Sequence, residues 1–197
     1  MKTIVVGGVA GGASAAARLR RLDEKAEIIL LERGGFISFA NCGLPYYIGG
    51  RIVEQEALTL QTPESFKARF NVDVRIMSEA VAIDREKKLV AIKNHATGEE
   101  YQESYDRLIL SPGAEPLRPP VGGEGSSRVF TLRNIPDTLK IKSFIAANKP
   151  KTAVVMGGGY IGVEMAENLR EAGLEVTIVE MADHLIAPLD YDMACVL

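Results

Sequence analysis

The chain has 197 residues, of which 47% are hydrophobic and 25% charged, and its formal net charge is −3. This composition indicates one large or two small soluble domains, and the lack of a basic block argues against nucleic acid or an anionic membrane as a partner. Two cysteines cannot build a disulfide framework, and the apolar run at the N-terminus is too short for a signal peptide or a membrane span, so the sequence predicts a cytoplasmic protein.

The first elements have the layout of a dinucleotide-binding βαβ unit. Residues 2–6 predict a buried parallel strand, residues 13–22 an Ala-rich helix, and residues 27–31 a second strand that ends in Glu32. The connecting turn is Gly7-Gly8-Val9-Ala10-Gly11-Gly12, where Val9 replaces the middle glycine of a strict G-x-G-x-x-G. In such a unit the glycines allow close backbone approach, the helix N-terminus faces a pyrophosphate, and the acid bonds ribose hydroxyls.

Three polar residues share one face of this helix, because Ser14, Arg18 and Arg21 stand at i, i+4 and i+7. They form either a solvated stripe or a phosphate-binding face, since guanidinium groups match phosphate oxygens bidentately.

A lone cysteine follows the unit, in a segment that reads as a loop turning into a helix. Cys42 is either a buried structural residue, which is the usual fate of such a cysteine, or a redox centre. The redox interpretation is favoured because a helix N-terminus lowers a thiol pKa and because a nucleotide would bind beside it.

The middle of the chain alternates in short strands. A helix opens at Thr62-Pro63 and ends near residue 70, and residues 72–77, 79–84, 89–94 and 99–104 then predict an antiparallel meander. Residues 105–110 predict a further strand, residues 116–125 a linker rich in Pro and Gly, and residues 135–148 a helix.

The opening pattern then returns. Residues 152–156 predict a strand, Gly157-Gly158-Gly159-Tyr160-Ile161-Gly162 is a full G-x-G-x-x-G, and a helix over 163–172 leads to a strand over 175–179 that ends in Glu180. Gly7 and Gly12 map onto Gly157 and Gly162 at an offset of 150. Two dinucleotide sites in one chain indicate electron transfer between FAD and a nicotinamide.

The order of the two units suggests which cofactor each takes. The first runs directly into Cys42 and is expected to take FAD, and the second to take NAD(P)H. Glu180 favours NADH over NADPH because it would repel a 2′-phosphate. The predicted fold is α/β, with two Rossmann-like βαβ units and a small antiparallel meander. Its expected domains are residues 1–115 (the first segment of an FAD-binding domain), 116–150 (linker and helix) and 151–197 (the start of an NAD(P)H-binding domain).

Several motifs carry a resemblance to a known family, namely residues 6–12, 38–46, 110–114, 131–134 and 157–164. On these motifs the chain resembles the N-terminal part of the pyridine nucleotide–disulfide oxidoreductases. More narrowly, it is similar to their single-cysteine branch of coenzyme A-disulfide reductases, NADH-dependent persulfide reductases, NADH oxidases and NADH peroxidases. Val9, and Asn41-Cys42 followed by Leu44-Pro45-Tyr46, are typical of the coenzyme A-disulfide reductases. Tyr47 stands where two-cysteine relatives carry their second cysteine.

The resemblance implies roles for individual residues. Cys42 is implied to be the redox nucleophile that reduces coenzyme A disulfide or a persulfide, with electrons passing from NAD(P)H through FAD. Contacts with coenzyme A are implied for Ser14, Arg18, Arg21, Ser38 and Asn41. Contacts with FAD are implied for Gly7, Val9, Ala10, Gly11, Gly12, Glu32, Arg33, Asn41, Cys42, Val81, Ser111, Gly113 and Arg133. Contacts with the nicotinamide cofactor are implied for Gly157, Gly159, Tyr160, Ile161, Gly162, Glu164 and Glu180.

Two alternatives remain open. In an NADH oxidase or peroxidase, Cys42 would cycle through a sulfenic acid. A non-catalytic nucleotide-binding fragment is also possible, because family members continue with the rest of the nicotinamide domain, a second flavin-contacting segment and a dimerisation domain. The full-length protein is expected to be a homodimer. No metal site is expected, because no other His or Cys residues cluster with His95 or His184 in the sequence. Cys195 is expected to be structural or incidental.

Overall fold

The computed structural model describes residues 1–123 and 125–196, which form two compact units. The first unit consists of residues 1–39 and 59–115. The second consists of residues 40–58 together with those from 116 onward. Residues 40–58 therefore pack with the later half of the chain although they follow the first βαβ unit in sequence.

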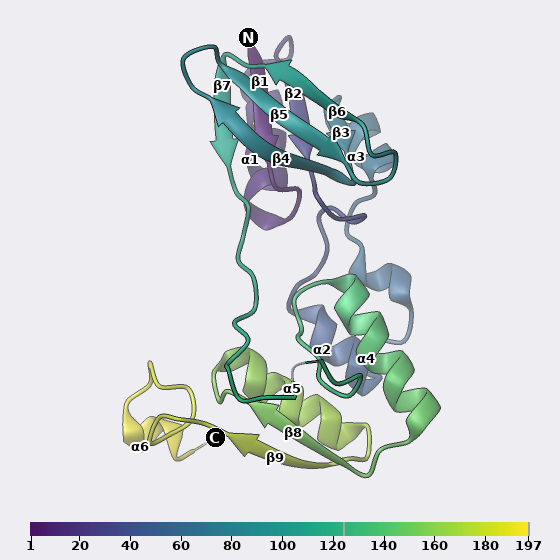
Figure 1. Cartoon of the computed structure of the whole chain (residues 1–197), viewed down its shortest axis with the longest axis vertical. Helices are drawn as coiled ribbons and strands as arrows, with labels where there is room; N and C mark the ends of the chain where they lie inside the picture. Colours follow the sequence, from purple (N-terminus) through teal and green to yellow (C-terminus); the bar gives the residue numbers. More distant parts are fainter. Residues whose placement is uncertain (124, 197) are drawn as a thin grey trace. The chain divides into compact units, whose positions relative to one another are not determined.

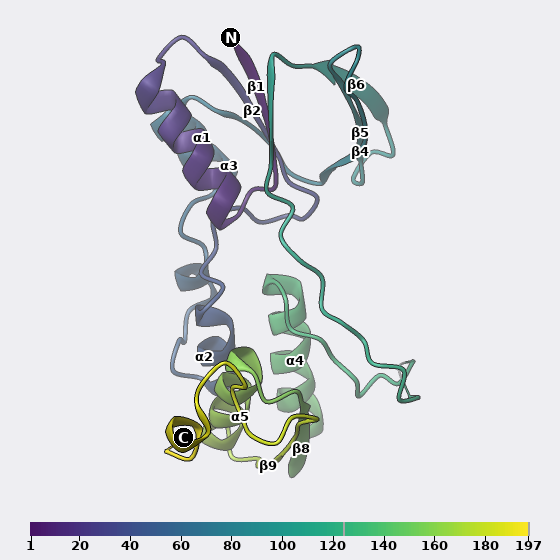
Figure 2. The ribbon, with the colours of Figure 1, turned by 90° about the vertical axis from the view of Figure 1, so that its left-hand side faces the viewer.

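The first unit has three layers around a parallel sheet of order β3-β2-β1-β7 (Figure 2). Its strands are β1 (Lys2–Val6), β2 (Glu27–Leu31), β3 (Asp73–Arg75) and β7 (Arg107–Leu110), and all neighbouring pairs are parallel. Helices α1 (Ala10–Leu22) and α3 (Pro63–Phe70) cover one face, and the meander β4 (Ser78–Asp84), β5 (Leu89–Asn94) and β6 (Glu100–Ser104) covers the other. Because side chains alternate along a strand, Val5 packs with the helices while Ile4 packs with the meander.

The predicted meander is wrong in one strand. Residues 73–75 pair in parallel with β2, so the meander has three strands rather than four. The change of direction occurs at Met77, which has a φ of 52° and whose N–H and C=O bond Gly34 and His95 respectively. This left-handed residue separates β3 in the parallel sheet from β4 in the meander.

Helix α1 begins three residues earlier than predicted, at Ala10, and α5 (Tyr160–Glu171) likewise begins at Tyr160. The Ala13 N–H already bonds the Val9 carbonyl, and the Val163 N–H bonds Gly159. The last glycine of each motif therefore lies inside a helix and not in the turn.

The second unit has a parallel pair, β8 (Thr152–Met156) and β9 (Glu175–Val179), with α5 between them in sequence. Helix α2 (Gly43–Gly49) packs against both α5 and α4 (Ile135–Asn148) (Figure 1). A buried apolar cluster joins these helices through Ile48, Ile141, Met165, Leu169 and Leu174. The short elements η1 (Gln55–Leu58) and α6 (Tyr191–Ala194) complete the unit.

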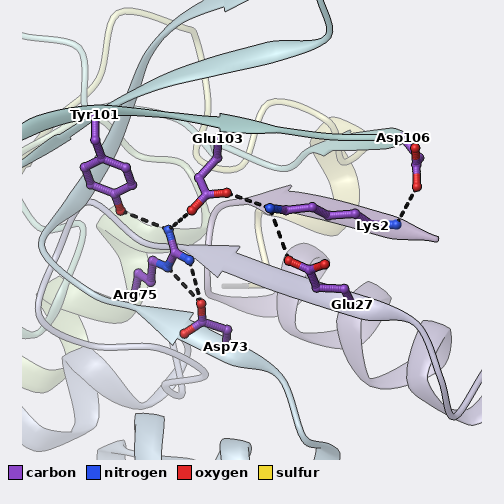
Figure 3. A network of polar contacts seen from close by, with 7 residues as sticks. All are labelled: Lys2, Glu27, Asp73, Arg75, Tyr101, Glu103 and Asp106. Atoms are coloured by element: carbon purple, nitrogen blue, oxygen red, sulfur yellow. Dashed lines mark hydrogen bonds and ion pairs between the residues drawn. The ribbon is translucent and has the colours of Figure 1, made fainter.

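A network of charges joins the two sheets of the first unit (Figure 3). Glu103 on β6 accepts hydrogen bonds from the Lys2 ammonium at 2.7 Å and from the Arg75 guanidinium at 2.8 Å. Glu27 pairs with the Lys2 ammonium, Asp106 accepts from the Lys2 backbone N–H, and Asp73 and Tyr101 contact Arg75. Cations from the parallel sheet thus hold the meander in place. Across the described ranges, no helix is both long enough and apolar enough to cross a bilayer.

Candidate functional site

Two glycine turns of the same geometry follow the first strand of each βαβ unit. Gly7 and Gly157 both have a φ of +101°, and their N–H groups bond the last residue of the adjacent strand, Leu31 or Val179, at 2.8 Å. A methyl group on Gly12 would lie 1.8 Å from the Gly7 carbonyl oxygen, and the equivalent distance at Gly162 is 1.9 Å. Only glycine fits at these positions, because the helix passes directly over the strand end.

Each turn is hydrogen-bonded to the acidic residue that follows the second strand. The Gly8 N–H donates to Glu32 Oε2 at 2.8 Å, and the Gly158 N–H donates to Glu180 Oε2 at 2.5 Å. The second oxygen of Glu180 accepts from the N–H groups of Met181 and Ala182. These hydrogen bonds, led by that from Ala182, hold the pKa of Glu180 below its ordinary value. Glu180 is therefore a fixed negative charge beside the turn.

The duplication also includes the loops that follow Glu32 and Glu180. The match between the two glycine motifs in the sequence does not reveal this part. The Ser38 N–H bonds the Gly8 carbonyl at 2.9 Å, and the Ile186 N–H bonds the Gly158 carbonyl at 2.8 Å. Both residues are left-handed, with φ values of 45° and 48°. Ser38 and Ile186 share no chemistry, so the match is visible only in the backbone.

The two helices that start at these turns have no cap. Neither α1 nor α5 has a side-chain hydrogen bond at its N-cap, and neither has an acid in its first turn. By contrast, Thr62 caps α3 and Asn134 caps α4, and both of those helices carry an acid in the first turn. The positive ends of α1 and α5 are thus left for an anion, which fits a dinucleotide pyrophosphate.

Most of the predicted flavin contacts gather in the first unit. The Ser111 carbonyl lies against Gly7, since a methyl group there would be 2.0 Å from it, and Gly113 has a φ of +74°. Val81 is the extra residue of a β-bulge in β4, which leaves it out of register with β5. Arg33 pairs with Glu115 and lies 3.8 Å from Glu79, and the hydrogen bond to Glu115 raises its pKa.

The remaining predicted flavin contacts belong to the second unit, as do the nicotinamide contacts. The Arg133 N–H donates to Asp137 at 3.0 Å beside the start of α4. Tyr160 and Ile161 occupy the first turn of α5, and both are exposed. Glu164 lies one turn further on the same helix and is half-buried.

Cys42 is a free, exposed thiol at the N-cap of α2 in the second unit. The helix behind it is buried at Leu44 and Ile48, so the cysteine stands at the accessible end of an anchored segment. The Oδ1 atom of Asn41 is buried and has no hydrogen-bond partner among the described residues. Cys195 is also free and exposed.

The predicted phosphate-binding stripe lies on the open side of α1. Ser14, Arg18 and Arg21 are exposed, while the opposite face buries Ala13 and Ala16. Neither arginine forms an ion pair with any residue that the structure describes. Ser38 belongs to the same unit as this stripe and Asn41 to the other, so the predicted substrate residues are divided between the units.

The geometry has the features of a family that the sequence also matches. The model of the pyridine nucleotide-disulphide oxidoreductases matches residues 1–197. This chain belongs to that family. Within the ranges that the structure describes, no group of three His, Cys, Asp or Glu side chains could hold a metal ion.

Individual members of the pyridine nucleotide-disulphide oxidoreductases are closely similar. The coenzyme A disulfide reductase of Staphylococcus aureus is 43% identical over 192 residues, which cover 98% of this chain and 43% of that protein. The crystal structure of reduced Bacillus anthracis CoADR-RHD has a TM-score of 0.97 and 60% identity, covering 99% of this chain and 35% of the other. An NAD-dependent persulfide reductase from A. fulgidus has a TM-score of 0.94 and 38% identity, covering 100% and 36%. The chain thus spans less than half the length of the curated relatives it matches.

Proposed function

We propose that this chain is the electron-entry part of an FAD-dependent NAD(P)H oxidoreductase in which Cys42 reduces coenzyme A disulfide or a thiol persulfide. The observation that carries the proposal is the pair of uncapped glycine helices in a chain that also presents a free, exposed cysteine. Family membership and the names of the relatives support it. The domain division proposed for this chain is 1–115 for the first segment of an FAD-binding domain, 116–150 for a linker and helix, and 151–197 for the start of an NAD(P)H-binding domain.

The residues of the first turn are suited to FAD. The uncapped N-terminus of α1 would hold the pyrophosphate, and Glu32 would bond the ribose of the adenosine. The bulged Val81, together with Arg33 and Ser111, would complete the site from the neighbouring strands and loops. When bound, FAD accepts a hydride from a nicotinamide and passes an electron pair to a thiol partner.

The residues of the second turn are suited to NADH. The N-terminus of α5 would hold its pyrophosphate, and the ionised Glu180 would bond the 2′- and 3′-hydroxyls of the ribose. Tyr160 and Ile161 are exposed beside the turn, where a nicotinamide ring could pack. NADPH would bring a phosphate dianion against Glu180, and we therefore propose NADH as the preferred donor.

Cys42 would perform the thiol chemistry. Its thiolate attacks one sulfur of the disulfide, a mixed disulfide forms, and the first thiol leaves with its bonding electrons and takes a proton from solvent. Two electrons, which bound FAD would supply, would then break the mixed disulfide, restore the Cys42 thiolate and release the second thiol after it takes a proton from solvent. Exposure of Cys42 supports direct attack on a small substrate.

Coenzyme A is the proposed carrier of the disulfide or persulfide. Ser14, Arg18 and Arg21 offer a hydroxyl and two guanidinium groups without ion-pair partners in the described part of the chain, a donor set suited to phosphates. Ser38 and Asn41 would contribute further contacts near the cysteine segment. We further propose a cytoplasmic homodimer for the whole protein.

The test is a pair of cysteine variants of the whole protein. Cys42→Ser should abolish reduction of coenzyme A disulfide while NADH still reduces an artificial electron acceptor through the flavin. Cys195→Ser, the matched control, should leave both activities intact, because Cys195 has no role in the proposed chemistry. If Cys42→Ser reduces disulfides at an undiminished rate, Cys42 is not the redox centre. A protein that consumes NADH with oxygen or peroxide but not with disulfides would favour the oxidase or peroxidase alternative.

A further inference from the structure

We propose that Lys142 is a positioning residue for Cys42, acting through helix α2. The proposal rests on the proposed role of Cys42 as the thiol nucleophile. Lys142 lies on α4, about a hundred residues further along the chain, and contacts α2 within the second unit. Figure 1 shows α2 and α4 side by side.

Helix α2 depends on its neighbours for its position. It has seven residues, which is too short to be stable alone in water. Two of its last carbonyl groups accept hydrogen bonds from residues just after the helix, Tyr46 from the Ile52 N–H at 3.1 Å and Tyr47 from the Gly50 N–H at 3.3 Å. Cys42 is the residue directly before its first turn, so the sulfur moves with the helix.

Lys142 makes two contacts with one residue in the last turn of α2. Its ammonium donates to the Tyr47 carbonyl oxygen at 2.5 Å and lies 3.6 Å from the centre of the Tyr47 ring. The first contact adds a second, shorter hydrogen bond to a carbonyl that, among the described residues, otherwise accepts only from the Gly50 N–H, and it places a cation at the negative end of the helix. The second is a cation–π interaction with a ring that is only 9% exposed. Together they fix both the backbone and the side chain of Tyr47.

The charge of Lys142 is unusual in its surroundings. Burial lowers its pKa, and no carboxylate of the described residues lies within ion-pair distance of its ammonium. Partial desolvation of an ammonium without an acid is unfavourable unless other acceptors replace water. The Tyr47 carbonyl and ring are those acceptors, which distinguishes Lys142 from a lysine that merely covers apolar surface.

Close packing on two sides also holds helix α2. Ile48 is buried in the cluster with Ile141, the neighbour of Lys142 on α4. On the other side, Gly49 lies so close to the fully buried Asn168 of α5 that a methyl group there would be 2.6 Å from Asn168 Oδ1. Helix α2 is therefore seated against α5 by close packing and held from α4 by Lys142. Lys142 therefore supplies the polar contacts that hold α2, and the buried side chains supply the apolar ones.

The experiment compares three lysine variants in the whole protein. Lys142→Met keeps the volume and removes the ammonium, Lys142→Arg keeps a cation that can reach both the carbonyl and the ring, and Lys140→Met is the matched control on the same helix, where the lysine is exposed. Hydrogen–deuterium exchange of residues 43–50 is followed first, because it does not depend on activity. Lys142→Met should accelerate it at least about tenfold, which corresponds to ~1.4 kcal/mol. Lys140→Met should change it less than twofold.

The second measurement separates positioning from general support of the fold. Lys142→Met should lower kcat for coenzyme A disulfide at least about tenfold, leave NADH-dependent reduction of an artificial acceptor within twofold, and be largely rescued by Lys142→Arg. Equal loss of both activities, or unchanged exchange in residues 43–50, would overturn the proposal. If the wild-type protein does not reduce coenzyme A disulfide at all, the proposed function fails. Two measurements then still decide the role of Lys142, namely the hydrogen–deuterium exchange of α2 and the alkylation rate of Cys42 in a Cys195→Ser background. If Lys142→Met changes neither rate, the proposal is overturned. If it accelerates both, the proposal is supported.

Discussion

Replacing Glu103 with Gln should destabilise the first unit by breaking the charge network between its two sheets. Glu103 accepts one hydrogen bond from Lys2 at 2.7 Å and one from Arg75 at 2.8 Å (Figure 3). Its side chain is 19% exposed, and those of Lys2 and Arg75 are 23% and 26% exposed. A glutamine of the same shape removes the negative charge and turns an amide N–H₂ toward one of the two cations.

The cost follows from the number and burial of the lost interactions. Each hydrogen bond between charged groups contributes about 1.5–3 kcal/mol, and partial exposure reduces this. Two such bonds give an expected loss of roughly 2–4 kcal/mol in the free energy of unfolding. This overlaps the lower end of the cost of breaking a fully buried ion pair. Arg75 keeps Asp73 and Lys2 keeps Glu27, so neither cation is left without an acid.

Glu100→Gln is the matched control, because Glu100 lies on the same strand but is 67% exposed. Among the described residues it has a single ion-pair partner, Lys93, at the longer distance of 3.4 Å. It should cost less than about 0.5 kcal/mol. Urea unfolding followed by far-UV circular dichroism measures both variants, since the chain has no tryptophan. Equal midpoints for Glu100→Gln and Glu103→Gln would refute the reasoning.

The same network predicts a pH dependence. Burial alone would raise the pKa of Glu103, but its hydrogen bonds with Lys2 and Arg75 outweigh burial and lower it. A lowered pKa in the folded state means that the stabilisation is complete above the ordinary value of 4.5 and is lost as the pH falls through the folded-state value. The difference between wild type and Glu103→Gln should therefore be constant near neutral pH and shrink below about pH 4.5. A difference that grows on acidification would contradict the ionised pair.

Three further outcomes test the candidate site. Arg18→Ala combined with Arg21→Ala should raise the KM for coenzyme A disulfide at least about tenfold and leave that for a small uncharged disulfide nearly unchanged, because only the former carries phosphates; equal loss on both would mean that the arginines only support the fold. Glu180→Ala should raise kcat/KM for NADPH relative to NADH about tenfold or more, and a wild-type preference for NADPH would show that Glu180 does not repel the phosphate. Gly162→Ala should abolish NADH binding in a titration, because its methyl group would lie 1.9 Å from the Gly157 carbonyl oxygen; retained affinity would mean that the turn is not the binding site.

The sequence predicted the regular elements well where a local rule governs them. Alternating and buried apolar runs located β1, β2, β5, β8 and β9 to the residue, and Thr62-Pro63 located the start of α3. The fold class is confirmed for the same reason, since two glycine turns with their strands and acids are local signals.

Long-range pairing could not be predicted in this way. Nothing in residues 73–75 indicates that they pair with β2, and the left-handed Met77 that separates them from the meander is not indicated either. The bulge at Val81 and the left-handed Ile186 are similarly invisible, because neither residue type favours such a conformation. Membership of residues 40–58 in the second unit is set by packing of Ile48 and Tyr47 against α4 and α5, which only the folded chain supplies.

Val9 departs from two local sequence rules at the start of α1. It breaks the strict glycine motif, and it also occupies the N-cap of α1, where Ser, Thr, Asp or Asn would stabilise the helix by about 1 kcal/mol. Side-chain caps are present at Thr62 and Asn134, whereas the N-caps of α1 and α5, like those of the short helices α2 and α6, have none. A side-chain oxygen at either N-cap would bond the same N–H groups that a pyrophosphate needs. At the two glycine turns the missing caps therefore leave room for an anionic ligand, as local rules tend to fail where function competes with stability.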